Sequence, residues 1–244
     1  MYKVFQYTIK HITHSEFPLF MKPILLFDID GTLLSVERKF MHTLISEILE
    51  SLSIDPAILA DTPFAGRTDQ SIFRSLLGEN QDNDRLYNEL KTRYLAGMHQ
   101  RLHPTHVSVF EHVKQCLNYF NEREYHMGLL TGNFREIAAH KLGIAGFREY
   151  FSFGAFGCDH TDRNLLGMAA RESYKEKHER DADPGDFIII GDTPLDIRCA
   201  KHFGCRSVIV TTGHYSREEL AGLEPDIILD SLEKPGEWGD NFEL

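Results

Sequence analysis

The chain has 244 residues, and its 37 acidic and 26 basic side chains give a formal net charge of −11. This length is enough for a sizeable core in one or two domains. The acidic balance argues against a dedicated nucleic-acid binder and against docking on an anionic membrane surface. No apolar run approaches the ~18 residues that a membrane span needs. The four cysteines form no Cys-x-x-Cys pair, which favours a reduced, cytoplasmic setting.

The first 20 residues resemble no secretory signal, because they lack a continuous apolar stretch and a small-residue cleavage site. We expect an N-terminal extension over residues 1–20 and assign it no function.

Short apolar runs predict strands that are buried on both faces. These strands are expected at 24–27, 127–130, 187–190 and 208–210, with weaker candidates at 151–156 and 226–229. Helical spacing of apolar residues lies between them, at 108–123, 133–142, 164–178 and 195–203. Strands that alternate with helices predict an α/β fold with a parallel sheet covered on both faces. In such sheets the ligand crevice lies outside the carboxyl ends of the strands.

One block interrupts this alternation, because residues 36–104 show helical patterning and no convincing strand. Its first helix carries apolar residues at every fourth position, from Val36 to Leu52, and further helices are expected at 55–60, 69–78 and 82–102. We therefore predict an all-helical cap at 36–104, inserted into a core of 21–35 and 105–244. The cap would lie over the crevice, with hinges near Leu34–Ser35 and near 103–107.

The sharpest motif is Asp28-Ile29-Asp30-Gly31-Thr32, which directly follows the first predicted strand. Alternate side chains of a strand point the same way, so Asp28 and Asp30 can converge at its end. Two such carboxylates need a cation or a shared proton, and the pair suits a nucleophile beside a proton donor. A calcium loop also starts with Asp-x-Asp, but it requires Gly and Glu where this chain has Leu33 and Lys39.

A second motif, Thr131-Gly132-Asn133, follows the strand predicted at 127–130. Its hydroxyl, glycine N–H and amide at the start of a helix suit an anion such as phosphate. A simple helix N-cap is the alternative.

The third motif is Gly191-Asp192-Thr193-Pro194-Leu195-Asp196, after the strand at 187–190. Asp192 can reach a metal ion, whereas Asp196 is better placed to support the metal ligands. Helix capping explains either aspartate separately, but it does not explain why acidic pairs end two different strands.

A cation is needed to offset the charge of a nucleophile and a phosphate together. Arg163, in Asp162-Arg163-Asn164, is the candidate. A solvated surface arginine is the alternative, and Lys175 and Lys177 compete from further along the predicted helix.

In chain order these motifs resemble the haloacid dehalogenase superfamily, in particular its phosphatases with a helical cap, over about residues 21–235. The resemblance points to the group of phosphoglycolate phosphatases and β-phosphoglucomutases. It implies a Rossmann-like, doubly wound parallel sheet with an inserted all-helical cap. Many relatives have a lysine in a Lys-Pro motif where this chain has GCDHTDRNLL, so Arg163 would take that place.

The resemblance implies that Asp28 attacks phosphorus and forms an aspartyl-phosphate. Asp30 would protonate the leaving oxygen and then deprotonate the attacking water. Mg²⁺ would be held by Asp28, by the backbone carbonyl of Asp30 and by Asp192. The acid at position 30 argues against the namesake dehalogenase activity.

The same resemblance gives the remaining site residues their roles. Thr131, Gly132 and Asn133 would bind phosphoryl oxygens, Arg163 would orient Asp28, and Asp196 would support the metal site. Within the cap, Arg67 of Gly66-Arg67-Thr68-Asp69 would contact the substrate, although a helix-capping turn with a solvated arginine is an equal alternative.

The sequence thus predicts a magnesium-dependent phosphatase of a small phosphorylated metabolite, such as phosphoglycolate or a sugar phosphate. A phosphomutase of the β-phosphoglucomutase type shares the motifs and stays open. A catalytically idle binding module is the third alternative, although four retained site residues argue against it. We expect a monomer or homodimer with neither nucleic acid nor membrane as a partner.

Overall fold

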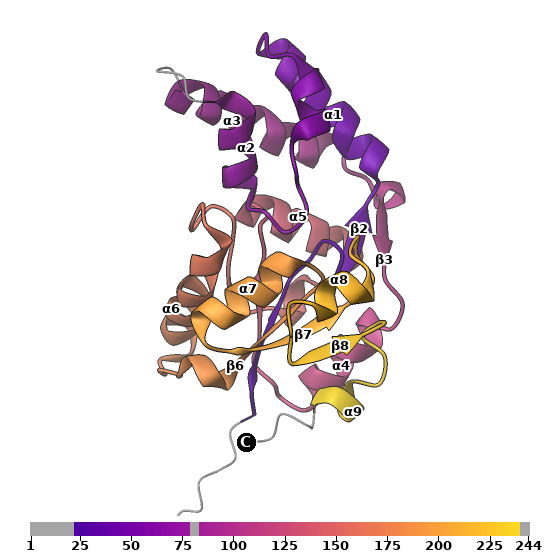
Figure 1. The fold of residues 1–244 in the computed structure, drawn as a ribbon, viewed down its shortest axis with the longest axis vertical. Helices are drawn as coiled ribbons and strands as arrows, with labels where there is room; N and C mark the ends of the chain where they lie inside the picture. Colours follow the sequence, from indigo (N-terminus) through magenta and orange to yellow (C-terminus); the bar gives the residue numbers. More distant parts are fainter. Residues whose placement is uncertain (1–21, 79–82, 240–244) are drawn as a thin grey trace, which may run out of the picture.

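The computed structural model describes residues 22–78 and 83–239, so the predicted extension at 1–20 lies outside the described residues. Its centre is a parallel sheet with helices around it (Figure 1). The strand order is β5-β4-β1-β6-β7-β8. The strands are β1 (Ile24–Phe27), β4 (Met127–Leu130), β5 (Phe153–Ala155), β6 (Phe187–Gly191), β7 (Arg206–Val210) and β8 (Ile227–Leu229). In register, Leu26 of β1 lies between Gly128 of β4 and Ile189 of β6.

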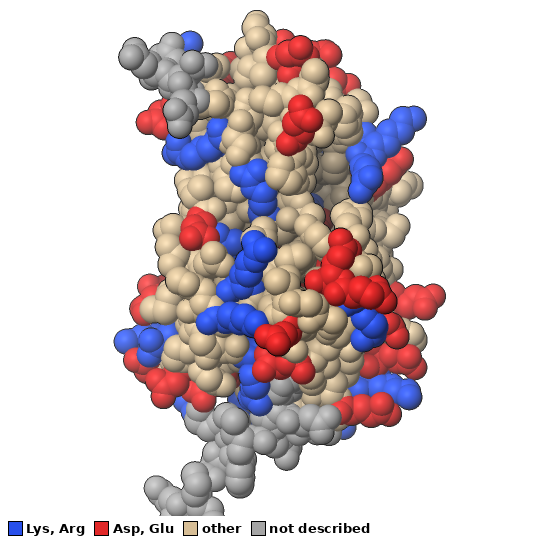
Figure 2. All heavy atoms as spheres, viewed as in Figure 1, with Lys and Arg blue, Asp and Glu red and all other residues tan. Residues whose placement is uncertain are grey.

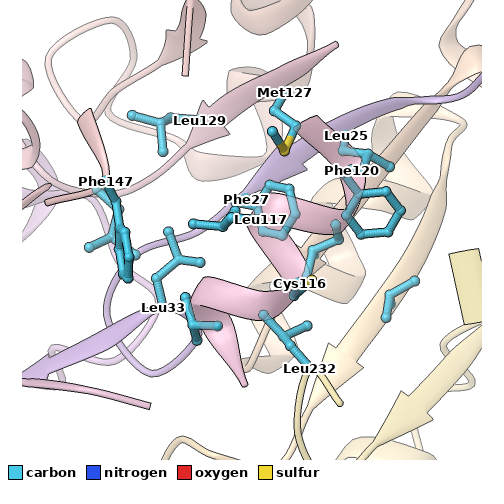
Figure 3. Packing of buried hydrophobic residues seen from close by; sticks show 14 of the residues in the cluster. Leu25, Phe27, Leu33, Cys116, Leu117, Phe120, Met127, Leu129, Phe147 and Leu232 are labelled. Carbon is cyan, nitrogen blue, oxygen red and sulfur yellow. The ribbon is translucent and has the colours of Figure 1, made fainter. Parts of the chain in front are cut away.

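Helices cover both faces of this sheet because alternate strand residues pack in opposite directions. Leu25 and Phe27 belong to one core with Cys116, Leu117 and Phe120 (Figure 3). This face is covered by α4 (Val113–Glu122), α5 (Arg135–Ala145) and α9 (Pro235–Gly239). The opposite face is covered by α6 (Leu166–His178) and α7 (Pro194–Phe203), and α8 (Arg217–Ala221) packs beside Ile197 and Ile209. The predicted α/β fold is confirmed.

A second hydrophobic core lies among helices beyond the carboxyl ends of the strands (Figure 1). These helices are α1 (Arg38–Ser51), the 3₁₀ helix η1 (Pro56–Asp61), α2 (Asp69–Leu77) and α3 (Asn83–Arg101). We call them the helical cap. The stripe predicted in α1 is buried at Phe40, Leu44 and Ile48. That the cap moves as a separate domain with hinges at its ends stays a prediction.

Two short strands join the cap to the sheet, and the sequence analysis missed both. β2 (Leu34–Val36) pairs antiparallel with β3 (Val107–Val109). The helix predicted from residue 108 was therefore wrong at its start, since α4 begins only at Val113. His112 has a φ of +65°, a left-handed conformation that separates the strand from the helix.

Other predicted elements differ in detail. The segment expected as a helix at 55–60 is the 3₁₀ helix η1, whose entry is capped by the Asp55 carboxylate accepting from the Ala57 N–H at 2.9 Å. The weaker strand candidates shorten to three residues each, β5 and β8.

The surface view in Figure 2 shows acidic and basic side chains interspersed over both the cap and the core on one face. No helix of the described residues has the length and apolar character required to cross a membrane.

The cap contacts the core through Phe134, which directly precedes α5. Its ring lies 5.4 Å from that of Phe73 on α2 and 6.4 Å from that of Tyr94 on α3. Phe134 is fully buried, so one aromatic side chain of the core completes the hydrophobic interior of the cap.

The loop before α2 adds polar contacts to the same junction. The Thr68 hydroxyl donates to the Thr161 carbonyl at 2.7 Å. The Asp69 N–H donates to the Gly132 carbonyl at 2.7 Å, and the Phe134 N–H donates to the Asp69 carboxylate at 2.7 Å. The cap loop is therefore bonded to the backbone of the Thr131-Gly132-Asn133 motif.

We predict that Asp69→Asn changes how stability depends on pH. Burial of the carboxyl raises the pKa of Asp69 from 3.8 to about 7, although Lys141 and the Phe134 N–H oppose the rise. Between these values the unfolded chain releases the proton while the folded chain keeps it, so wild-type stability falls as pH rises. Asparagine retains the acceptor oxygen and lacks this loss.

Urea unfolding at pH 5 and pH 8 measures the effect. The stability of Asp69→Asn relative to wild type should increase by about 1–2 kcal/mol between the two pH values. Asp84→Asn, which changes an exposed carboxylate of the cap, is the control. A constant difference between Asp69→Asn and wild type would contradict the assignment.

Candidate active site

The predicted motifs follow three adjacent strands and lie together at one edge of the sheet. β1 lies between β4 and β6, and the three strands run parallel. Asp28 directly follows β1, Thr131 follows β4, and Asp192 follows β6. Because the carboxyl ends of parallel strands share one edge of the sheet, motifs far apart in sequence meet there.

The centre of the site is a group of three buried carboxylates. Asp28, Asp192 and Asp196 each offer an oxygen, and these atoms lie within 4.8 Å of one another. Their residues are exposed by only 4%, 3% and 0%. Like charges that are this close and shielded from water repel strongly, so the three carboxylates need compensating positive charge.

Arg163 supplies part of that charge from the entry to α6. Its Nη2 lies 2.5 Å from Asp196 Oδ1 and 3.3 Å from Asp28 Oδ1. The residue is only 4% exposed, so the alternative of a solvated surface arginine was wrong. The competing Lys175 instead pairs with Asp181 at 3.3 Å, where both side chains are about half exposed.

Asp196 has both carboxylate oxygens occupied by protein groups. Oδ1 accepts from Arg163, while Oδ2 accepts from the Thr193 hydroxyl at 2.7 Å and the Thr193 N–H at 3.0 Å. It therefore holds the first turn of α7 and the guanidinium together. Asp28 and Asp192 are left as the better donors for a metal ion.

The backbone closes tightly around Asp192. A Cβ at Gly31 would lie 2.1 Å from Asp192 Oδ2, and a Cβ at Gly213 would lie 1.8 Å from the same atom. Gly31 also has a φ of +88°. Any side chain at these two positions would displace the carboxylate, so space requires glycine at both, and conformation favours it at Gly31 as well.

The site has more negative than positive charge. Burial raises the pKa of Asp28 to about 6, even though Arg163 opposes the rise. Burial, together with Asp196 and Asp28, raises the pKa of Asp192 well above its ordinary value. A divalent cation would relieve this repulsion, and carboxylate oxygens are the ligands that Mg²⁺ prefers. The residues present therefore fit a magnesium ion.

The Thr131-Gly132-Asn133 motif lies beside these carboxylates. The Thr131 hydroxyl accepts from Asn133 Nδ2 at 2.9 Å and from the Asn133 N–H at 3.3 Å. Its own proton thus stays available to a further acceptor. A Cβ at Gly132 would lie 2.1 Å from the Arg67 carbonyl and 3.2 Å from Arg163 Nη1. The glycine lets the cap loop and the guanidinium approach the same turn.

Asp30 turns toward a lysine that the sequence analysis did not identify. Lys141 Nζ lies 2.6 Å from Asp30 Oδ2 and 2.8 Å from Asp30 Oδ1. Lys141 is 3% exposed, which is rare for lysine without a charged partner. The available signal was its place at the apolar positions of α5, next to Leu142 and in step with Ile137 and Ala138.

Arg67 does not join this group. Its guanidinium donates to the Ser71 carbonyl at 2.9 Å, the Ser75 hydroxyl at 2.7 Å and the Pro63 carbonyl at 3.3 Å. All three partners belong to the cap, so the structure uses this side chain to brace the cap loop. Its contact with a substrate stays a prediction.

Comparison with known proteins gives the chain its relatives. A probable phosphatase, IndB, of Dickeya dadantii is 25% identical over 222 residues, which cover 87% of this chain and 91% of that protein. The phosphoglycolate phosphatase of Vibrio vulnificus is 29% identical over 120 residues, and the match spans about half of each protein, 49% and 51%.

Solved structures share the fold at low sequence identity. A predicted phosphatase from Clostridium acetobutylicum has a TM-score of 0.69 at 19% identity, covering 91% of this chain and 98% of that one. The β-phosphoglucomutase of Clostridium difficile has a TM-score of 0.66 at 16% identity, covering 91% and 97%.

The family model described as haloacid dehalogenase-like hydrolase matches residues 25–210, from the first strand of the sheet to the end of β7. This span includes Asp28, Asp30, Thr131, Arg163 and Asp192. The chain therefore belongs to the haloacid dehalogenase-like hydrolase family.

Proposed function

We propose that the protein is a magnesium-dependent phosphatase that hydrolyses a small organic phosphate monoester through an aspartyl-phosphate. The observation that carries the proposal is the position of the Asp28 carboxylate, buried between Arg163 and Asp192 at the end of β1. The family membership supports phosphate-ester hydrolysis, and so do the phosphatase names of several relatives.

In the first step an Asp28 oxygen attacks phosphorus and forms a new O–P bond. The bond to the substrate's alkoxide oxygen breaks, and Asp30 gives that oxygen its proton. Arg163 Nη2, 3.3 Å from Asp28 Oδ1, orients the nucleophile and offsets charge that accumulates as it approaches the phosphate. Mutual repulsion of two anions would otherwise oppose the attack.

In the second step water attacks the phosphorus of the aspartyl-phosphate. Asp30, now ionised, takes a proton from that water, and the Asp28 carboxylate leaves with its bonding electrons. Inorganic phosphate is released, and both aspartates regain their starting protonation states. Dividing a difficult displacement between two easier ones is the usual advantage of a covalent intermediate.

The phosphoryl oxygens would be held by the motif that follows β4. The Thr131 hydroxyl has a proton to donate, and the N–H groups of Gly132 and Asn133 lie at the turn before α5. These neutral donors bind the oxygens without adding charge to the nucleophile.

Mg²⁺ would be held by Asp28, Asp192 and the backbone carbonyl of Asp30, and when bound it would neutralise phosphoryl charge. Thr32 fixes one of these ligands, because its hydroxyl donates to Asp192 Oδ1 at 3.2 Å. Asp196 supports the arrangement by holding Arg163 and the start of α7.

The cap restricts the substrate to a small phosphorylated metabolite, of the phosphoglycolate or sugar-phosphate type. Gly66 supports this restriction, because a Cβ there would lie 2.5 Å from Thr193 Oγ1 of the core. A cap loop this close to the motif after β6 leaves little room beside the nucleophile.

Asp28→Asn should lower phosphatase activity by at least about 10³-fold, because an amide cannot attack phosphorus as a carboxylate does. Release of inorganic phosphate from a panel of small phosphate monoesters, with Mg²⁺ present, measures the loss. Asp181→Asn, which removes a half-exposed carboxylate far along the chain, is the matched control. Activity retained by Asp28→Asn would remove the nucleophile assignment.

Release of phosphate by the wild-type protein without an isomerised product separates hydrolysis from mutase activity.

Chelation of divalent metal should abolish hydrolysis, and added Mg²⁺ should restore it. Binding to the folded state alone should also raise the unfolding temperature, by an amount that corresponds to about 2.7 kcal/mol at 100-fold excess over Kd. Asp192→Asn should lose this thermal shift because a charged ligand is removed, whereas Asp181→Asn should keep it. An unchanged shift in Asp192→Asn would exclude the proposed metal position.

A further inference from the structure

Among the residues that the structure describes, Lys141 is the buried charged residue to which the proposed mechanism gives no role. It lies on α5, and its ammonium group has three protons to donate. Each has a partner: Asp30 Oδ2 at 2.6 Å, Asp30 Oδ1 at 2.8 Å and Asn133 Oδ1 at 2.7 Å. All three ammonium protons of this lysine are therefore donated to two residues of the site, Asp30 and Asn133.

Asn133 closes these contacts into a ring. Its Nδ2 donates to Asp30 Oδ2 at 2.7 Å and to Thr131 Oγ1 at 2.9 Å. Because its carbonyl oxygen accepts from Lys141, the amide orientation is fixed at both ends. Asp30 thus accepts three hydrogen bonds from two side chains of one turn and helix, and its carboxylate has a defined direction.

The two cations of the site serve different carboxylates. Arg163 pairs with Asp28 and Asp196, whereas Lys141 pairs with Asp30. The Lys141 side chain is 4% exposed and that of Asp30 is 40% exposed. The lysine therefore holds the Asp30 carboxylate from the protein interior, while part of the Asp30 side chain stays exposed.

We propose that Lys141 is a positioning residue, which with Asn133 holds the Asp30 carboxyl where it exchanges a proton with the leaving oxygen and then with water. The inference rests on the proposed function, since it gives Asp30 the acid and base steps. Lys141 itself touches neither phosphorus nor the leaving group. Its contribution should therefore depend on how much the reaction needs Asp30.

This dependence separates positioning from other roles. The kcat/KM value reports the steps up to departure of the leaving group, and an acid matters more when that group is a poor one. Loss of positioning should therefore reduce kcat/KM for a poor leaving group more than for a good one. A general distortion of the site should reduce both equally.

The experiment compares Lys141→Met with wild type on substituted phenyl phosphates whose leaving-group pKa values differ, in the presence of Mg²⁺. We expect kcat/KM for phenyl phosphate to fall by about 10²-fold and that for 4-nitrophenyl phosphate by less than about 3-fold. The plot of log kcat/KM against leaving-group pKa becomes steeper. Since Asp30 also acts as the base, a stoichiometric burst of 4-nitrophenol should precede slow turnover.

Two further variants complete the test of the positioning role. Lys141→Gln keeps a donor for Asp30 and should lie between Lys141→Met and wild type, which provides a second measurement if the methionine variant folds poorly. Lys91→Met is the matched control. Lys91 lies on α3 of the cap, and its Nζ is 4.7 Å from the ring centroid of Phe134, which directly precedes α5. This variant should keep the wild-type slope.

Equal losses on all phenyl phosphates, or an unchanged slope, would overturn the role of Lys141. So would a defect confined to KM for substrates with a second anionic group, since that result would make Lys141 a substrate contact. If wild type hydrolyses neither these esters nor any member of the panel of small phosphate monoesters, the proposed function itself fails. Hydrolysis by wild type with an unchanged slope in Lys141→Met removes only the positioning role.

Discussion

The structure depends on an unbalanced charge at the edge of the sheet. Asp28, Asp192 and Asp196 lie within 4.8 Å of one another in a dry environment, and one guanidinium, Arg163, faces two of them. Buried charges are costly to keep, and groups of this kind cluster at sites where a ligand or a reaction uses them. Burial raises the pKa of Asp28 to about 6, and the neighbouring Asp196 and Asp30 add to the rise, although Arg163 opposes it. A divalent cation would offset this negative charge, and the proposed phosphate substrate would add to the need for one.

Separate cations allow two neighbouring aspartates to do different work. Asp28 and Asp30 are only two residues apart, yet the first contacts Arg163 and the second contacts Lys141. A single shared cation would couple the two carboxylates and make them alike. With separate partners, the two carboxylates have different environments: Asp28 is buried, whereas the Asp30 side chain is 40% exposed. This difference suits the proposed division between a nucleophile and a proton-exchanging group.

The sequence predicted those features that depend on neighbours in the chain. Apolar runs followed by Asp or Thr located the ends of β1, β4 and β6, because strand burial and strand-end chemistry are both local patterns. The pairing of β2 with β3 was missed, since each strand has three residues and its partner lies about 70 residues away. Lys141 was missed for a related reason: its partner Asp30 is 111 positions away, and nothing near Lys141 indicates a carboxylate. Arg67 is the opposite case, a residue that the sequence pattern singled out for substrate contact. Its guanidinium instead bonds to the adjacent helix α2, and a sequence pattern does not reveal which of these partners an arginine takes.

The junction between cap and core uses the same short turn that the phosphate would occupy. Gly132 accepts the Asp69 N–H, and its own Cα leaves room for the Arg67 carbonyl and for Arg163. The next residue, Asn133, bonds to Asp30 and Lys141, and the one after it, Phe134, fills the interior of the cap. Three consecutive residues thus contact the cap loop, the acid and the cap core. A shift of the cap relative to the sheet would disturb the direction of Asp30 through this turn. The residues that follow β4 therefore link the position of the cap to the direction of Asp30, the proposed acid.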